Sequence, residues 1–322
     1  PAIQDRSHNL YGSFFDNTYT LIDSSDHEIA LNGGLRYDNH PNTGGTVSHR
    51  LSLMYSLMNF HYFRLTWGSS YRNPDFIESY YDRFSLYKKG DINTNSPDTY
   101  LHVYGQESNQ AEKAMVYEFA YLIESPSRYR ASAILFYSQI NDFVYFITES
   151  DRLYWDSSLN GNVIPMPFKN IGDAHQYGAE AELYVPITDY LSGTINYTWY
   201  DQKEEEKIVK QLLLMTPQQM ANAQLRFTFK KGWSANVSAH FRDATEWRTY
   251  TWEHPERSTH AGGKAPGYLI ANSRIAYEFT TDGNQIEIAL AVFNLFDKHY
   301  DAYPMDTSDI RRRITGYFSL AF

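Results

Sequence analysis

The chain has 322 residues, no cysteine, and a formal net charge of −10 from 28 basic and 38 acidic side chains. The lack of cysteine excludes disulfides, thiolate metal ligands and cysteine catalysis, and the acidic balance argues against nucleic acid as a partner. No apolar run of about 18 residues is present, which excludes a transmembrane helix. Aromatic residues make up 16% of the chain, so a disordered chain is excluded as well. What remains is a soluble globular protein or a membrane barrel whose apolar residues alternate with polar ones.

Alternation of apolar and polar residues with a period of two predicts β-strands along most of the chain. For example, Ala221, Leu225 and Phe229 fall on one face of an extended segment, whereas Asn222 and Arg226 fall on the other. With turn residues as boundaries, the predicted strands are 8–22, 27–38, 46–57, 60–72, 113–124, 128–147, 174–186, 190–201, 218–230, 233–245, 267–280, 284–296 and 312–322.

The connections between these strands alternate in length. Short turns, such as 125–127 and 281–283, are followed by longer links, of which 73–112 is the longest. Short periplasmic turns and long extracellular loops are typical of a transmembrane barrel, and a soluble sandwich has no reason to keep this rhythm. Aromatic residues near strand ends fit the two interfacial girdles of such a barrel: Tyr11, Tyr37, Trp67, Tyr121, Tyr137, Trp199, Trp233 and Tyr268.

The number of strands predicts how much of a barrel the chain supplies. The last strand follows a long link and should end on the periplasmic side, so that the first of thirteen strands enters from outside. Bacterial single-chain barrels have even strand numbers, and an odd number therefore predicts the C-terminal piece of a longer barrel. A miscounted strand, most expected at 141–148, would overturn this prediction.

Several motifs resemble those of the TonB-dependent outer-membrane receptors, in that family's order and spacing. The most specific is Val292–Tyr300, with the sequence VFNLFDKHY, and the C-terminal Phe322 resembles the signal read by the barrel-assembly machinery. Phe119 departs from the pattern, because a glycine usually follows the preceding glutamate. The other matching stretches are Gly33–Asp38, Gly68–Phe76, Glu112 with Glu118, and Asn170, Gly172, Gly178, Glu180 and Glu182.

The resemblance implies an all-β chain that folds as part of an antiparallel transmembrane β-barrel, in which residues 1–322 supply the C-terminal ~13 strands of a 22-stranded barrel. It implies that the family's N-terminal plug domain is not present in this chain. The expected function is the ligand-binding and transport barrel of a receptor in the outer membrane of a Gram-negative bacterium. Expected partners are outer-membrane lipid, the receptor's own plug, the TonB complex through that plug, and an iron-chelate ligand. Neither enzyme activity nor a cofactor is expected.

The resemblance assigns the inward strand face to contact with the plug, through salt bridges and hydrogen bonds. Exposed ion pairs of this kind contribute only about 0–1 kcal/mol each, so a hydrated wall is the plainer interpretation. Glu180 and Glu182 share one strand face, but nothing places a substrate between them, which argues against acid–base catalysis. The residues predicted to face the plug are Arg36, Glu118, Glu180, Glu182, Arg226, Arg242 and Arg274.

Two long links carry the residues predicted to contact a ligand. Aromatic rings supply stacking surface and nearby Arg and Lys side chains supply positive charge, which suits a flat, anionic ligand such as a ferric catecholate. The alternative is that these aromatic residues pack on one another as an ordered cap. The predicted contacts are Tyr80, Tyr81, Arg83, Tyr87, Tyr100 and His102 in 73–112, and Trp247, Tyr250, Trp252 and Arg257 in 246–266.

A ferric siderophore is the leading ligand, with haem and cobalamin as alternatives within the family and an oligosaccharide still open. His102 lies downstream of the Tyr71–Pro74 motif and is the candidate iron ligand if haem is bound, although a lone loop histidine is more often solvated. No spacing typical of a zinc or EF-hand calcium site is present. A passive porin, an outer-membrane enzyme and a soluble binding module are the alternatives outside the receptor family.

Overall fold

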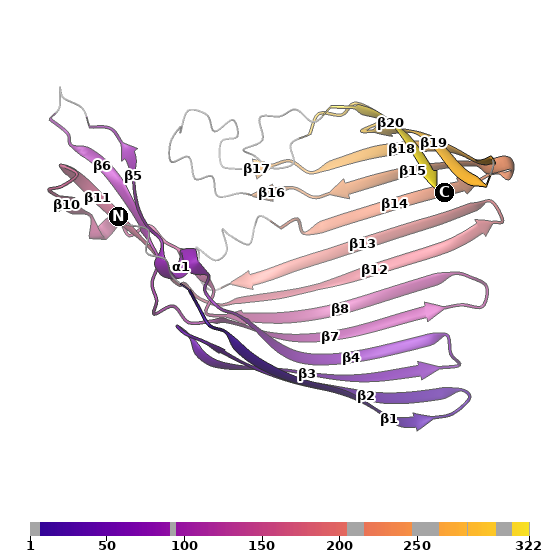
Figure 1. Ribbon diagram of the computed structural model, residues 1–322, viewed down its shortest axis with the longest axis horizontal. Coiled ribbons are helices and arrows are strands. Elements are labelled where there is room, and N and C mark those ends of the chain that lie inside the picture. Colours follow the sequence, from indigo (N-terminus) through magenta and orange to yellow (C-terminus); the bar gives the residue numbers. More distant parts are fainter. Residues whose placement is uncertain are drawn as a thin grey trace.

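The computed structural model describes residues 7–90, 95–204, 216–246, 264–281, 283–300 and 311–321. Thirteen strands of this part of the chain form one antiparallel sheet, the large sheet, in which each strand pairs with the next in chain order (Figure 1). The strands are β1 (Tyr11–Asp23), β2 (His27–His40), β3 (Gly44–Leu57), β4 (His61–Arg72), β7 (Glu112–Glu124), β8 (Arg130–Asn141), β12 (Ala174–Thr188), β13 (Leu191–Glu204), β14 (Gln219–Thr228), β15 (Trp233–Arg242), β18 (Tyr268–Thr281), β19 (Asn284–Phe293) and β20 (Arg313–Ala321).

All thirteen predicted strands are confirmed, and the boundary of one is wrong. The strand predicted at 128–147 ends at Asn141, because the backbone turns at Asp142, where φ is 60°. The segment beyond it forms β9 (Val144–Phe146), which leaves the large sheet. The number of strands in the large sheet is unchanged by this error.

The short turns all lie at one edge of the large sheet, on the right in Figure 1. Met58 and Asn59 have φ values of 54° and 57°, and Lys231 and Gly232 have 66° and 82°. Two successive positive values are the signature of the tight hairpin turn that matches strand twist. At Gly232 a Cβ atom would overlap the Glu278 carbonyl oxygen, so the turn requires glycine at this position.

The opposite edge carries a second, smaller sheet built from the two longest links. It consists of β5 (Asp82–Lys88), β6 (Asp98–Tyr104), β9, β10 (Tyr154–Asp156) and β11 (Gly161–Asn170), with β6 and β11 paired in parallel. Together with α1 (Phe76–Tyr80) and the 3₁₀ turn η1 (Ser150–Arg152), this sheet is called the cap. None of the described helices is long and apolar enough to cross a membrane. A two-stranded pair, β16 (Thr245–Glu246) with β17 (Lys264–Ala265), lies outside both sheets.

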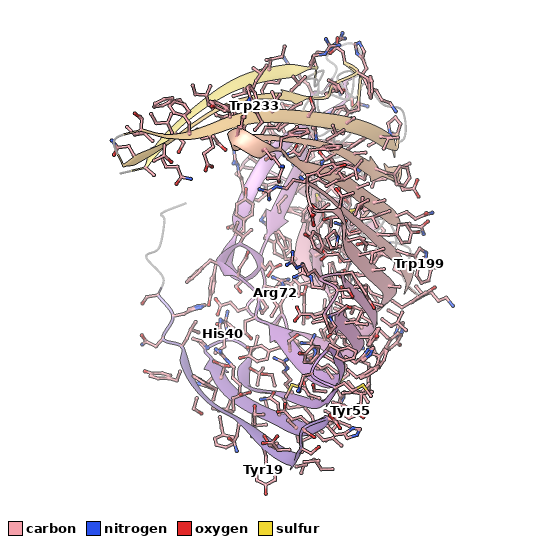
Figure 2. The ribbon with its side chains drawn as sticks, turned by 90° about the vertical axis from the view of Figure 1, so that its right-hand side faces the viewer. Tyr19, His40, Tyr55, Arg72, Trp199 and Trp233 are labelled. Atoms are coloured by element: carbon pink, nitrogen blue, oxygen red, sulfur yellow. The ribbon has the colours of Figure 1, made fainter. Side chains whose placement is uncertain are left out.

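Strict alternation gives the large sheet two different faces, here named inner and outer. The inner face carries Arg36 and Glu118, whereas the outer face carries Leu35, Leu65 and Leu135, which are 56%, 57% and 55% exposed. Figure 2 shows the sheet curled, with Tyr19 and Trp199 on its outer perimeter and Arg72 within the curl. Exposed leucines on one whole face are costly in water and favourable in lipid.

Aromatic rings near both strand ends bracket this apolar face. On β15, Trp233 and Phe241 are eight residues apart on the outer face, which is about 26 Å along a strand and about 20 Å across a membrane at the usual tilt. One member of the predicted girdles is wrong. Tyr268 pairs with Arg242 in the β15–β18 register, and the Arg242 guanidinium lies 5.3 Å from its ring, so Tyr268 belongs to the inner face.

The VFNLFDKHY motif forms a compact turn after β19. Asn294 and Asp297 both have a φ of 53°, and the Asn294 amide donates to the Lys298 carbonyl oxygen and accepts from the Lys298 N–H. Asp297 accepts hydrogen bonds from the Arg311 guanidinium and from the Arg312 N–H, at 2.8 Å each. The hydrogen bond from the Arg311 side chain, and then the one from the Arg312 N–H, lower the pKa of Asp297 to about 2. The motif therefore fastens the chain that enters β20.

We expect the hydrogen bonds that Asp297 accepts to be lost at low pH. Because the pKa of Asp297 is lowered from 3.8 to about 2, its contribution is complete above pH 4 and is lost as the pH falls through 2. Hydrogen exchange of the Arg312 amide measures it: protection at pH 4 should exceed protection at pH 2 after correction for intrinsic rates. Asp297→Asn should lack this difference, and an unchanged pH profile in that variant would contradict the assignment.

Candidate functional site

The cap is joined to the large sheet within the Gly68–Phe76 motif, between the end of β4 and the start of α1. Asp75 caps α1 with a reciprocal pair of hydrogen bonds: its carboxylate accepts from the Glu78 N–H at 2.8 Å, and its own N–H donates to the Glu78 carboxylate at 2.9 Å. The Arg72 guanidinium, at the end of β4, donates to Glu78 at 2.8 and 2.9 Å and to Glu112 on β7 at 2.7 and 2.6 Å. Glu112 also accepts from the Val144 N–H at 2.8 Å. One guanidinium thus connects two strands of the large sheet with α1.

Two asparagines add to this connection between the cap and the large sheet, which is called the joint. The buried Asn109 donates to the carbonyl oxygens of Glu78 and Phe168, both at 3.1 Å. Asn170 accepts from the Gln110 N–H at 2.9 Å and donates to the Asp142 carbonyl oxygen at 2.6 Å. Backbone groups of both long links are therefore satisfied by side chains at one place, which orders the links without a continuous ladder.

One face of the cap carries a stack of rings. The rings of Phe84 and His102 are parallel, with centroids 4.0 Å apart and an angle of 8°, and Tyr104 lies 4.7 Å from His102. The His102 Nε2 atom is 2.7 Å from Asp82 Oδ1. Tyr100 shares this face of β6, because it lies two residues from His102. Phe84 remains 39% exposed, so the stack presents an open aromatic edge.

The acid–base state of the cap follows from its contacts. Burial, and then the nearby Asp156, raises the pKa of the Tyr154 phenol above its ordinary value. Hydrogen bonds from the Ser158 hydroxyl and the Leu159 N–H lower the pKa of Asp156. At neutral pH the phenol is therefore protonated and the carboxylate ionised. In this state Tyr154 can stack and donate a hydrogen bond.

The six predicted ligand contacts in the first long link lie in the cap, and the structure brings only some of them together. Tyr100 and His102 share one face, whereas Arg83 lies on the opposite face of β5, and Tyr87 is 50% exposed at a bulge. The Tyr80 hydroxyl donates to Asn42 at 2.9 Å, and Tyr81 is the C-cap residue that follows α1. The remaining predicted contacts lie outside the described residues: Trp247, Tyr250, Trp252 and Arg257.

The inner face carries the predicted charged residues, several of them in ion pairs. Glu118 pairs with Arg64 at 2.6 Å, and Arg274 pairs with Glu287 at 2.6 Å. Further pairs join Arg36 with Asp38 and Glu182 with Arg130, the latter at 3.3 Å. Glu180 and Arg226 lie on the same face by register, and Arg242 donates to the Thr245 hydroxyl at 2.9 Å.

Sequence reasoning missed three arginines that organise these contacts. Arg64 and Arg130 hold the predicted Glu118 and Glu182, and Arg72 holds the joint. The first two could have been found, because they stand at the inward phase of strand alternation like Arg36. No group of three or more His, Asp or Glu side chains suited to a metal ion occurs in the described ranges.

Comparison with known proteins identifies the class of this barrel. The family model "TonB dependent receptor-like, beta-barrel" matches residues 2–295. The chain therefore belongs to the TonB-dependent receptors, a family of outer-membrane proteins, and the part of the family that it matches is the β-barrel.

Known relatives are similar to this chain at low identity. The iron-regulated outer membrane virulence protein of Vibrio cholerae serotype O1 is 22% identical over 298 residues, which are 91% of this chain and 41% of that protein. A mutant ferric enterobactin receptor from Pseudomonas aeruginosa, solved with enterobactin, has a TM-score of 0.73 at 18% identity and covers 99% of this chain and 46% of that one. The siderophore receptor PirA from Acinetobacter baumannii has a TM-score of 0.65 at 16% identity, over 90% and 42% of the chains. This chain thus spans less than half the length of these relatives.

Proposed function

We propose that this chain is the ligand-binding and transport barrel of a receptor that takes up a ferric siderophore across the outer membrane of a Gram-negative bacterium. The observation that carries the proposal is the ordered cap, whose aromatic edge at Phe84, Tyr100 and His102 stands at the sheet edge opposite the short turns. Open aromatic rings bind flat ligands by stacking. The relatives named as siderophore and iron-regulated proteins support the same ligand class.

The proposal includes partners that close and fill the barrel. Among the described strands, β1 and β20 each have one unpaired edge in the large sheet. Unpaired backbone groups are not tolerated in lipid, so we infer that further strands of the receptor pair with these edges. The charged inner face, including Glu180, Arg226 and Arg242, then surrounds a plug domain through which TonB acts. Lipid contacts the outer face.

Among the ligand alternatives, the geometry of His102 favours a siderophore over haem. Its Nε2 atom bonds Asp82, so axial ligation of haem iron through this atom requires that hydrogen bond to break. A copper transporter, OprC, also shares the fold at a TM-score of 0.60, which shows that the fold alone does not choose the ligand. We attribute the choice of ligand to the residues of the cap.

Titration of the complete receptor with ferric catecholate, with tryptophan fluorescence as the readout of binding, tests the proposal. Phe84→Ala combined with Tyr104→Ala should weaken binding about tenfold, because each aromatic stacking contact contributes about 0.5–1.5 kcal/mol beyond area and about 1.4 kcal/mol corresponds to a factor of ten. Leu135→Ala on the outer face is the matched control and should bind as the unmodified receptor does. If the double variant and the unmodified receptor bind ferric catecholate with equal affinity, the cap is not part of the ligand site.

The passive-porin alternative gives a different result in the same material. A porin conducts ions continuously in a planar bilayer and shows no saturable chelate binding, whereas a plugged receptor conducts little. High conductance of the complete protein, together with no ferric-chelate binding, would overturn the proposed function.

A further inference from the structure

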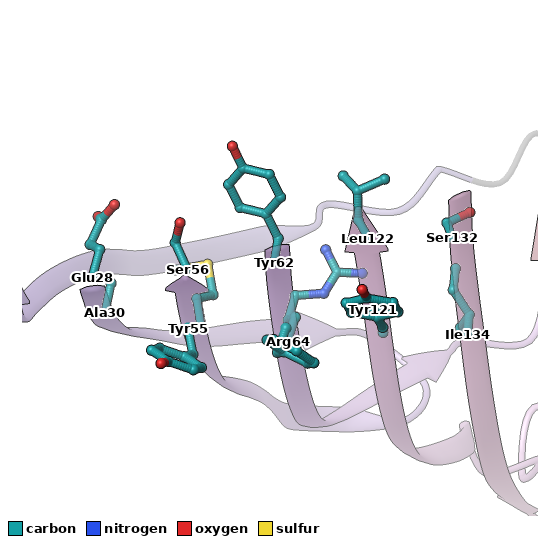
Figure 3. A pocket seen from close by; sticks show the side chains of 13 residues that line it. Glu28, Ala30, Tyr55, Ser56, Tyr62, Arg64, Tyr121, Leu122, Ser132 and Ile134 are labelled. Carbon is teal, nitrogen blue, oxygen red and sulfur yellow. The ribbon is translucent and has the colours of Figure 1, made fainter. Parts of the chain in front are cut away.

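The outer face of the large sheet contains an apolar groove. Its volume is about 510 Å³, and its lining comes from β12, β13, β14, β15 and β18. Another hollow, of about 520 Å³, lies on the inner face, where Ala30, Arg64 and Ile134 are among its lining residues (Figure 3). The inner hollow opens toward the interior of the barrel, whereas the outer face meets the hydrocarbon of the membrane. Of the two, only the outer groove is accessible to the acyl chains of lipids.

A row of alanines forms the floor of the groove. Ala223 pairs with Ala239, and Ala239 pairs with Ala271, so three neighbouring strands carry a methyl group at the same level of the outer face. One step further toward the cap, Phe241 pairs with Leu269, and both side chains are exposed. These longer side chains close the groove at that end.

The groove runs from this floor toward the short-turn edge. Ile187, next to the last residue of β12, belongs to its lining. Two pairs of rings stand on the outer face at the level of the turn between β14 and β15. Phe227 and Phe229 have centroids 6.0 Å apart, and Trp233 and Tyr277 have centroids 4.8 Å apart. Aromatic rings of this kind lie at the headgroup level of a bilayer, so the open end of the groove lies at the interface with water.

The length of the groove matches one leaflet of a bilayer. Ala239 is six residues from Trp233 on β15, which is about 20 Å along a strand and about 14 Å across a membrane at the usual tilt. The hydrocarbon of one leaflet is about 15 Å thick. An acyl chain that begins at the level of Trp233 therefore ends near the alanine floor.

The turn at the open end carries two cations. Lys230 and Lys231 of η2 (Lys230–Gly232) are exposed, and within the part of the chain that the structure describes neither ammonium group has a hydrogen bond or an ion pair. The nearby Glu278 belongs to the inner face, where its carboxylate accepts from Gln285 at 2.6 Å. The two lysines are therefore complementary to a negatively charged headgroup next to Trp233.

We propose that the groove binds one anionic phospholipid from the leaflet at the short-turn edge. One acyl chain fills the groove as far as Ala239, and the phosphate lies within reach of Lys230 and Lys231. Lipid contact over the whole outer face does not distinguish one lipid from another, whereas this site selects lipids by headgroup charge. The inference rests on the proposed function only because that function places the outer face in lipid.

Native mass spectrometry of the complete receptor tests the site. The receptor is stripped of lipid in detergent and is then given equal amounts of phosphatidylglycerol and phosphatidylethanolamine. One phosphatidylglycerol should stay bound per receptor at collision energies that remove phosphatidylethanolamine. No retained lipid, or equal retention of the two lipids, would overturn the proposal. A receptor dimer without bound lipid would also contradict it, because a second copy of the chain would then fill the groove.

Charge removal tests the headgroup contact. Lys230→Gln combined with Lys231→Gln should weaken phosphatidylglycerol binding about thirtyfold, which is about fivefold for each lysine near anionic lipid. Arg128→Gln removes a cation from the turn between β7 and β8 at the same edge and is the matched control, with unchanged retention expected. Equal binding by the lysine double variant and the control would exclude the two lysines from the site.

Filling the groove tests the acyl-chain contact. Ala239→Trp should remove phosphatidylglycerol retention, and its ring has room on the outer face because both cross-strand partners are alanines. Leu65→Trp, on the outer face of β4, is the matched control and should retain the lipid. Undiminished retention in folded Ala239→Trp contradicts the groove as the chain site. Because lipid retention needs no chelate, a receptor that fails the chelate titration but keeps phosphatidylglycerol refutes the proposed ligand and not the lipid site.

Discussion

Replacing Arg72 with methionine is expected to release the cap from the large sheet while the sheet itself stays folded. The substitution removes four hydrogen bonds and leaves the carboxylates of Glu78 and Glu112 without their cation, although their side chains are only 11% and 12% exposed. Breaking a buried pair on one side costs about 3–5 kcal/mol, and because the Arg72 side chain is 46% exposed we expect about 2–3 kcal/mol. Limited proteolysis should then cut the cap first.

Two variants make this expectation specific. Arg72→Lys should not restore the cap, because an ammonium cannot reach two carboxylates in the fork geometry of a guanidinium. Arg130→Met is the matched control: its pair with Glu182 is 3.3 Å long with both side chains largely exposed, and it should cost about 0–1 kcal/mol. Equal protease sensitivity in Arg72→Met and Arg130→Met would show that the joint does not hold the cap.

Gly178→Ala is expected to destabilise the large sheet itself. A Cβ atom at this position would overlap the Trp199 carbonyl oxygen and lie 2.6 Å from the Phe136 ring, so either a strand or the ring must move. Overpacking of this kind costs about 1–3 kcal/mol. The measurement is the urea midpoint for loss of the heat-modifiable barrel band in gel electrophoresis, which reports folding of the whole sheet.

Gly193→Ala is the control for the change of residue type. Gly193 lies on the neighbouring strand β13, where a Cβ atom would meet Ile187 at 3.4 Å and Leu225 at 3.5 Å, which are ordinary contacts. Both variants gain the same intrinsic strand preference over glycine. If the two midpoints shift equally, crowding at Phe136 is not the reason for glycine at position 178.

The candidate site divides into a part that the sequence predicted and a part that it did not. The inward positions of Arg36, Glu118, Glu182 and Arg274 followed from alternation, and their ion pairs are present in the structure. The grouping of Tyr100 with His102, and the separation of Arg83 from both, needed the strand register of the cap. From the sequence, the aromatic and basic residues of the link 73–112 form one undivided group of candidates, because alternation with a period of two does not continue across the turns within it.

By itself, the sequence determined the thirteen strands, the edge of short turns and the chemistry of the two faces of the large sheet. These features are local: alternation acts between residues two apart, and a hairpin turn acts within four residues. Only the tertiary structure decided that Asp142 ends β8, that Tyr268 turns inward, and that two links form one cap. The parallel pairing of β6 with β11 and the hold of Arg72 on Glu112 join residues far apart in the chain, and no local pattern encodes such contacts.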